Sequence, residues 1–169
     1  MRYKFFNLVI LIATICLLDR PALAQQKQDM TVEPPSKDTT MMSTTIHQEI
    51  DFAVSPQRVY DALLDSKQFS KFSGAPAEID SVVGGAFSLF GGRIVGRNIE
   101  LIPNHMIVQA WRVANWPAGV YSIVKFEFKS QGSGTHLVFD HSGFSPEFHD
   151  HLAAGWKSNY WDLLTKYLH

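Results

Sequence analysis

Three of the four tryptophans and one histidine are the residues of this chain best suited to hold a small molecule. Trp111, Trp116 and Trp156 offer large apolar rings, each with one N–H group to donate. His141 follows Phe139 at the two-residue step of a strand, so its imidazole is predicted to face inward at the rim of a cavity. There it could orient a ligand carbonyl or act as an acid or base. The alternative is a structural histidine bonded to backbone groups.

Arg112 is the second polar candidate for orienting a ligand. Neighbouring strand residues point to opposite faces, so either Trp111 or Arg112 faces the interior of the sheet, and the pattern leaves open which one. On the outer face, Arg112 would form no more than a surface ion pair. The other candidates are aromatic side chains that either line an apolar pocket or fill the core: Phe87, Phe126, Phe128, Phe139 and Tyr160.

Metal binding and nucleophilic catalysis are not predicted. His149 and His151 lie two positions apart in a predicted helix, so their rings point about 200° apart and cannot easily share one ion. The chain has no Gly-x-Ser-x-Gly, no phosphate-binding glycine loop and no His-Glu-x-x-His. Its single cysteine, Cys16, lies in a segment that is predicted to be removed. We therefore predict no metal site, no cofactor and no dedicated catalytic residue.

Residues 1–24 have the pattern of a secretory signal peptide. A short basic start precedes a largely apolar run at 8–18, and Ala22-Leu23-Ala24 then forms a small-x-small cleavage site. We expect cleavage between Ala24 and Gln25. The apolar run is shorter than the ~20 residues that cross a bilayer, so no stable membrane span is expected after cleavage. These features predict a secreted or periplasmic protein.

Length and composition indicate one folded domain. The chain has 169 residues, of which 46% are hydrophobic, 12% aromatic and 18% charged, a mixture that excludes an intrinsically disordered chain. The formal net charge of −1 and the lack of a basic block argue against nucleic acid as a partner. Residues 25–44 are polar and contain Pro34-Pro35, which predicts a flexible linker. The domain itself is expected at 45–169.

Apolar periodicity predicts an α+β fold. Alternation from Thr45 predicts a half-buried strand, and Ser55-Pro56 is expected to cap a helix that ends near Leu64. A second short helix is predicted at 67–72. From 78 to 142 the chain alternates and is interrupted by glycine and proline pairs, which predicts further antiparallel strands. We expect a curved sheet of about six strands.

The last segment is predicted to be one long amphipathic helix that begins after Ser145-Pro146 and packs on the sheet. Its expected apolar stripe consists of Phe148, Leu152, Trp156, Leu163 and Tyr167, with Tyr160 on the same side. Gly155 lies in mid-helix, where glycine costs ~1 kcal/mol relative to alanine. We expect this glycine to permit a close approach of the helix to a neighbour. A sheet wrapped around one helix leaves room for a pocket between them.

Four runs carry a resemblance to a known family: Phe87–Pro103, Ile107–Ser122, Gly134–Phe144 and Ala154–Leu164. Their most specific parts are Trp111-Arg112, Trp116-Pro117 and Gly155-Trp156. Together they resemble the C-terminal domain of the activator of heat shock protein 90 ATPase and the bacterial domains named after it. The resemblance covers 45–168 and implies the helix-grip fold of the START-like (SRPBCC) superfamily.

The resemblance implies three classes of function, because the superfamily includes carriers of lipids and other hydrophobic ligands, co-chaperones and polyketide cyclases. The leading interpretation is an exported domain that binds a small hydrophobic molecule or lipid between its sheet and its C-terminal helix. One alternative is a co-chaperone-like module with a protein partner, although predicted export separates it from a cytosolic chaperone. The other is a cyclase- or isomerase-type enzyme with acid/base groups drawn from Asn98, Glu100, Asp140 and His141.

Overall fold

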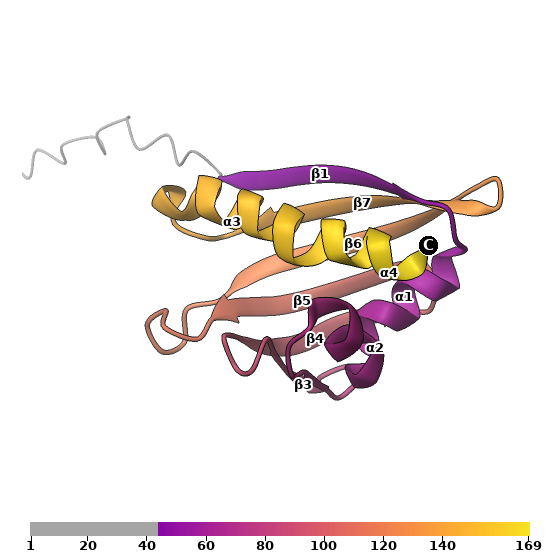
Figure 1. The fold of residues 1–169 in the computed structure, drawn as a ribbon. Coiled ribbons are helices and arrows are strands. Elements are labelled where there is room, and N and C mark those ends of the chain that lie inside the picture. The colour runs from indigo at the N-terminus through magenta and orange to yellow at the C-terminus, as the bar shows by residue number, and fades with distance from the viewer. Residues whose placement is uncertain (1–43) are drawn as a thin grey trace, which may run out of the picture. The chain divides into compact units, whose positions relative to one another are not determined.

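The computed structural model describes residues 44–169, which form one antiparallel sheet with helices packed on one of its faces (Figure 1). The predicted signal peptide, 1–24, lies outside the described residues. So does the predicted linker, 25–44, apart from its last residue. Within residues 44–169, no helix is both long enough and apolar enough to cross a membrane.

The sheet has seven strands in the order β1-β7-β6-β5-β4-β3-β2 within residues 44–169. Along the chain the elements before the last helix are β1 (Thr45–Phe52), α1 (Pro56–Leu64), α2 (Ser66–Ser73), β2 (Glu78–Ile79), β3 (Ala86–Leu89), β4 (Ile94–Ile102), β5 (Met106–Val113), β6 (Ser122–Gln131) and β7 (Gly134–Ser142). The α+β helix-grip prediction is confirmed. The expected six strands become seven because the two-residue β2 is too short to show an alternating pattern.

Both short helices lie where the sequence predicted them. Pro56 occupies the first turn of α1, and α2 ends at Gly74, which adopts a left-handed φ of 69°. Ser55 and Ser145 lie at the N-cap positions before Pro56 and Pro146, as predicted. Neither hydroxyl makes a capping hydrogen bond within residues 44–169, and that of Ser145 donates to the Glu147 carboxylate instead. The fixed φ of proline therefore starts these helices without help from the preceding serine.

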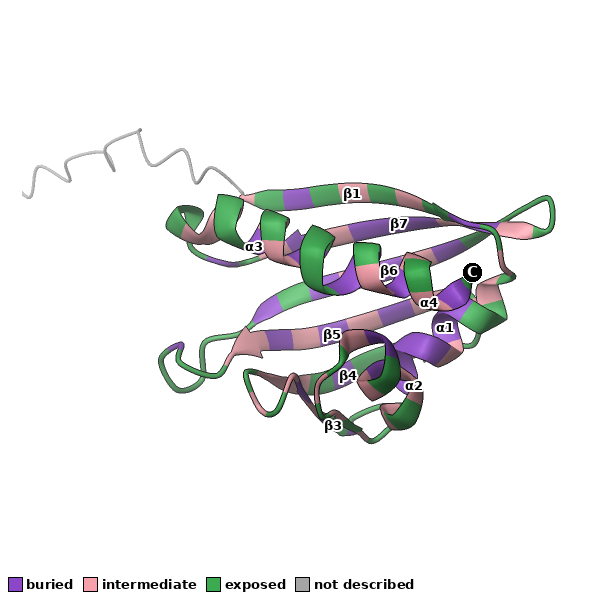
Figure 2. Cartoon of the chain, in the orientation of Figure 1, coloured by how far each residue is buried: buried purple, intermediate pink, exposed green. Residues whose placement is uncertain are grey.

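The strands bury one face, as their alternation predicted (Figure 2). Ile46 and Phe52 of β1 are buried, and so are the inward positions of β6 and β7: Val124, Phe126, Phe128, Thr135, Leu137, Phe139 and His141. The opposite face of β1, β7 and β6 is polar. Single-sided burial of this kind fixes the strand register, because a slip by one residue would turn the apolar set toward water.

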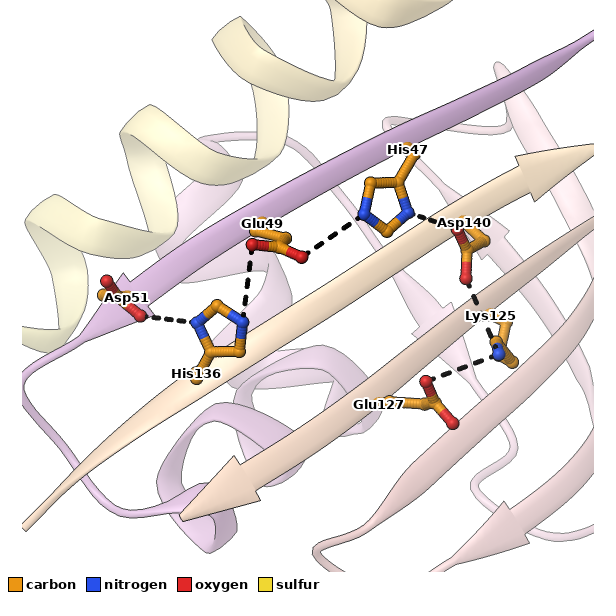
Figure 3. Close-up of polar contacts among 7 residues, drawn as sticks. All are labelled: His47, Glu49, Asp51, Lys125, Glu127, His136 and Asp140. Atoms are coloured by element: carbon orange, nitrogen blue, oxygen red, sulfur yellow. Dashed lines mark hydrogen bonds and ion pairs between the residues drawn. The ribbon is translucent and has the colours of Figure 1, made fainter. Parts of the chain in front are cut away.

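Imidazole and carboxylate groups alternate across this outer face (Figure 3). His47 Nδ1 lies 2.6 Å from an Asp140 carboxylate oxygen, and His136 Nδ1 lies 2.8 Å from one of Asp51. Lys125 extends this network, because its Nζ lies 3.5 Å from the second carboxylate oxygen of Asp140. The hydrogen bonds to Asp140 and then Glu49 raise the pKa of His47 above its ordinary value. These exposed pairs solubilise the sheet and contribute little to stability individually.

The C-terminal helix is continuous but not α-helical throughout. A 3₁₀ turn, η1 (Pro146–Phe148), leads into α3 (His149–Trp156), a π turn, η2 (Lys157–Trp161), and α4 (Asp162–Leu168). The π turn contains one residue more than an α turn, so it shifts the phase of every later side chain. The side chain of Gln48, on β1, bonds the helix on both sides of this turn. Its NH₂ group donates to the Ala153 carbonyl at 3.2 Å, and its oxygen accepts from the Trp161 indole N–H at 2.6 Å.

The predicted apolar stripe is therefore right through Tyr160, and after the π turn it is out of phase by one residue. Leu164 and Leu168 are buried, whereas the predicted Leu163 and Tyr167 are only partly covered. A second expectation for this helix also fails. A Cβ at Gly155 would meet only the Asn159 amide, at 3.8 Å, among the neighbouring atoms of the described chain. Gly155 thus borders open space and does not mediate a close helix contact.

Candidate ligand-binding cavity

A cavity of about 340 Å³ lies between the sheet and the C-terminal helix. Its walls come from the β3–β4 turn, β4, β5, α3 and the π turn: Phe90, Arg93, Ile94, Trp111, Val113, His151, Leu152, Gly155, Trp156, Asn159 and Tyr160. Sites for small molecules in proteins have volumes of ~300–1,000 Å³ and mostly apolar walls. The size and the lining of this cavity are those of such a site.

Exposure divides the cavity into a mouth and an inner end. Arg93, His151 and Asn159 are exposed to solvent, so they mark the mouth. Trp111 and Tyr160 are 3% and 5% exposed, and with Trp156 they form the aromatic inner wall. Tyr160 packs on Trp156 with ring centres 4.2 Å apart. A ligand that enters between the polar groups thus meets an apolar, aromatic interior.

Two polar atoms in this inner wall have no partner. Neither Trp111 Nε1 nor the Tyr160 hydroxyl makes a hydrogen bond within residues 44–169, although both are fully buried. Burial raises the pKa of Tyr160, and the nearby Trp111 indole opposes this rise without forming a well-aligned hydrogen bond. An unpaired buried polar group costs ~1–3 kcal/mol. A ligand oxygen at this place would relieve that cost for one or both groups.

Of the ten sequence-predicted site residues, Trp111, Trp156 and Tyr160 line the cavity, and the others lie elsewhere. Phe87 and Phe126 border a space of only about 10 Å³ behind Tyr160. Phe128 and Phe139 are buried in the core. Trp116 lines a separate surface hollow and stacks on Phe148 at 5.7 Å. These five residues therefore fill the core or, for Trp116, line a surface hollow, and they are not part of the cavity wall.

Arg112 points away from the cavity. Trp111 takes the inward position, and the Arg112 guanidinium donates to the carbonyl groups of Ala114, at 3.2 Å, and of Trp116. It also lies over the Tyr121 ring at 5.6 Å from its centre. Arg112 therefore ties down the loop between β5 and β6, a role that the sequence pattern left open.

His141 lies in the core behind the cavity wall, not at its rim. Its Nδ1 accepts the Trp156 indole N–H at 2.9 Å, which leaves the proton on Nε2. That Nε2–H donates to the Ser122 hydroxyl at 2.7 Å, and the hydroxyl donates to the Trp111 carbonyl at 2.9 Å. Burial lowers the pKa of His141 to about 3. This neutral imidazole positions Trp156 and the strand that carries Trp111.

The four residues of the acid/base alternative do not meet in the cavity. Asn98 is buried and bonded to Gln109 at 2.9 Å, and Asp140 lies on the outer face of the sheet. Glu100 is exposed on β4, and neither it nor His141 lines the cavity. In the described part of the chain, no three His, Cys, Asp or Glu side chains are placed as metal ligands.

The β3–β4 turn supplies two wall residues that the sequence analysis missed. Phe90, Gly91 and Gly92 all have left-handed φ values, of 52°, 66° and 88°. Such a conformation is strained for phenylalanine and tends to occur at ligand clamps. Contacts with Tyr160 at 5.2 Å and with Phe69 hold the Phe90 ring in place. The turn also brings Arg93 to the mouth. The glycine pair predicted a turn but not these left-handed residues.

Three further lining residues, which were not predicted, follow a pattern that is visible in the sequence. His151, Gly155 and Asn159 recur every four residues, one position before Leu152, Trp156 and Tyr160. Neighbouring four-step rows cover one helix face. The aromatic row was recognised, but the polar row beside it was not.

Comparison with known proteins gives a consistent assignment. Residues 53–169 match the family described as "Activator of Hsp90 ATPase homolog 1-like protein". An activator of 90 kDa heat shock protein ATPase homolog from Dictyostelium discoideum is 33% identical over 132 residues, which cover 78% of this chain and 34% of the relative. Homolog 1 from Homo sapiens is 26% identical over 111 residues, which cover 66% of this chain and 33% of the relative. The chain thus spans about a third of the length of these curated relatives.

A solved structure agrees with this assignment. An HSP90 activator from Plasmodium falciparum superimposes with a TM-score of 0.65 and 30% sequence identity, covering 69% of this chain and 90% of that one. The family match covers more than half of the chain and includes every strand after β1 and the whole C-terminal helix. The chain therefore belongs to the Activator of Hsp90 ATPase homolog 1-like family, within the START-like superfamily.

Proposed function

We propose that this protein binds a small apolar molecule in the cavity between its sheet and its C-terminal helix. The observation that carries the proposal is that two polar atoms in an otherwise aromatic wall, Trp111 Nε1 and the Tyr160 hydroxyl, have no hydrogen-bond partner within residues 44–169. Apolar surface that leaves water on binding contributes ~25 cal/mol per Å². The two polar atoms select a ligand with an oxygen in its buried part, because only a polar atom can relieve their missing hydrogen bonds.

The mechanism is shape-selective burial on a prepositioned wall. The ligand body packs on Trp111, Trp156 and Tyr160, and its oxygen accepts the Trp111 N–H. The hydrogen-bond chain through His141 holds Trp156 and β5 before the ligand arrives. A fixed wall lowers the ordering entropy lost on binding.

We also propose that the mature chain, 25–169, is exported to the periplasm or the medium. The basic start, the apolar run at 8–18 and the Ala22-Leu23-Ala24 site support this proposal. In that setting the protein carries or sequesters its ligand outside the cytoplasm. The mass of the protein recovered from the exported fraction tests cleavage after Ala24.

Native mass spectrometry of that fraction, purified without detergent, tests ligand binding. We expect an added mass that disappears under denaturing conditions. Gly155→Leu should abolish it, because the new side chain enters open space in the cavity wall. Ala154→Leu, an exposed neighbour on the same helix, should keep it. A wild-type protein that stays empty after exposure to a lipid extract would contradict the proposal.

A protein partner is the second candidate function, and sequence similarity favours it. The relatives at 33% and 30% identity are named as activators of a heat shock protein ATPase. If this chain acts in the same way, it raises the ATP hydrolysis rate of a purified 90 kDa heat shock protein from the same cell. An unchanged rate at saturating concentrations of the chain would exclude this function. Gly155→Leu should leave any such stimulation intact, which separates the two candidates.

A further inference from the structure

We propose that the ligand of this cavity is an apolar carboxylic acid whose ionised carboxylate pairs with Arg93 at the mouth. This inference rests on the proposed function of the cavity and adds the chemical class of its ligand. Three features support it: the charge of the cavity wall, the lack of a partner for Arg93 and the way in which the backbone places this arginine.

Among the described residues that line the cavity, Arg93 alone carries a permanent charge. The described residues of the wall contribute no aspartate and no glutamate, so nothing in it neutralises the guanidinium. His151 and Asn159 add a ring nitrogen and an amide donor at the same opening. A mouth with this lining favours an anion over a neutral or cationic group.

The Arg93 guanidinium is available for a ligand. No hydrogen bond or ion pair engages its side chain within residues 44–169. Two other arginines of the sheet are engaged: Arg97 donates to the Gly84 carbonyl at 2.9 Å, and Arg112 donates to the Ala114 carbonyl at 3.2 Å. An arginine whose side chain has no partner in the described chain, beside an apolar cavity, is placed to receive an external acceptor.

The backbone holds Arg93 at this position. The three left-handed residues before it, 90–92, reverse the chain, and the Arg93 carbonyl accepts the Ala114 amide at 2.8 Å. Only the side chain is left free to reach the ligand. A planar guanidinium fork matches the two oxygens of a carboxylate, which it can bind in bidentate geometry. A phosphate would keep a further charged oxygen without a cationic partner here, so we favour the carboxylate.

Binding of 10-hydroxydecanoic acid and of 1,10-decanediol to the purified protein tests the proposal. The two probes share one chain length and a hydroxyl oxygen for the buried end of the cavity, and they differ in the charged group at the mouth. At neutral pH and low salt we expect the acid to bind about tenfold more tightly, a typical effect of one partly desolvated charge pair. Arg93→Gln should remove this preference and leave the affinity for the diol unchanged. Arg97→Gln, on β4 directly after the turn that holds Arg93, should keep the preference.

Two results would overturn the inference in distinguishable ways. Equal affinities for acid and diol, unchanged by Arg93→Gln, would exclude the carboxylate while the proposed function stands. Failure of both probes to bind, together with a protein that carries no added mass in native mass spectrometry, would overturn the carboxylate and the proposed function together. A preference for the acid that persists in Arg93→Gln would also overturn the assigned role of Arg93.

Discussion

Acidification from pH 6.5 toward pH 3 is expected to destabilise the folded domain steeply, because of His141. Burial lowers the pKa of this imidazole to about 3, whereas an unfolded chain protonates it near 6.5. Between these values the unfolded state binds one proton more than the folded state, so stability falls as the pH falls. One proton corresponds to ~1.4 kcal/mol per pH unit at most. Protonation at Nδ1 would also remove the acceptor of the Trp156 indole N–H.

The pH window in which the effect of His141 is clearest lies between 6.5 and ~5, because carboxylic acids ordinarily titrate below this range. His47 contributes with the opposite sign, and at higher pH than this window. Its pKa is raised, so its stabilisation is complete below 6.5 and is lost only as the pH rises through the raised value. The His47 side chain is 55% exposed, and salt screens its pairing with Asp140. The buried imidazole should therefore dominate the pH dependence.

Urea unfolding at a series of pH values measures this effect. The free energy of unfolding of the wild type should decline through the window, and His141→Gln should have lower stability at neutral pH but a nearly flat profile. His47→Gln should keep the decline. A His141→Gln variant whose profile runs parallel to that of the wild type would show that His141 does not cause it.

Asn98→Ala is expected to lower the free energy of unfolding by ~3 kcal/mol. The Asn98 side chain is 1% exposed and bonds three neighbours. Its amide donates to the Asp80 carbonyl at 2.9 Å and to the Val82 carbonyl at 3.4 Å, and its oxygen accepts from the Gln109 amide at 2.9 Å. Alanine would leave the buried Gln109 amide without its acceptor, and the Asp80 and Val82 carbonyls without the Asn98 donor. Each such loss costs ~1–3 kcal/mol.

The same substitution should loosen the loop between β2 and β3. This loop is tied to β4 by the bond from Asn98 to Asp80 and by backbone bonds between Asn98 and the pair Gly84 and Gly85. Hydrogen exchange at the two glycine amides should therefore accelerate. Asn115→Ala, an exposed control, should change stability by less than ~0.5 kcal/mol. If Asn98→Ala unfolds at the wild-type denaturant concentration, the bonds of Asn98 are not stabilising.

Alternation along a strand made most of the sheet predictable. Val124, Phe126 and Phe128 repeat every second residue, so they had to share a face, and burial of that face needs no further information. The same argument placed His141 inward. It could not show that the indole of Trp156, on another element, would bond to its ring and remove it from the cavity. Contacts between distant segments carry no local signal.

The cavity was predictable in its aromatic part and not in its polar part. Trp156 and Tyr160 share a four-residue step that indicated a common wall. Arg93 reaches the mouth through three consecutive left-handed residues, one of them Phe90, which no propensity favours there. The phase error at Leu163 has a similar origin, since no residue type in the sequence indicates the π turn at Lys157–Trp161. Local strain of this kind is imposed by tertiary packing.

The additional residue of the π turn lets the two parts of the C-terminal helix make different contacts. The part before it, α3, gives the cavity its wall, whereas α4 anchors the helix against the small helices, with Tyr167 beside Phe72 at 6.3 Å. In a regular α-helix the same rows of side chains would have to serve both contacts, because all residues would follow one phase. Here the inserted residue sets the two parts in separate phase. Substitutions on α3 can consequently change which ligands the cavity binds, while the packing of α4 that stabilises the fold stays unchanged.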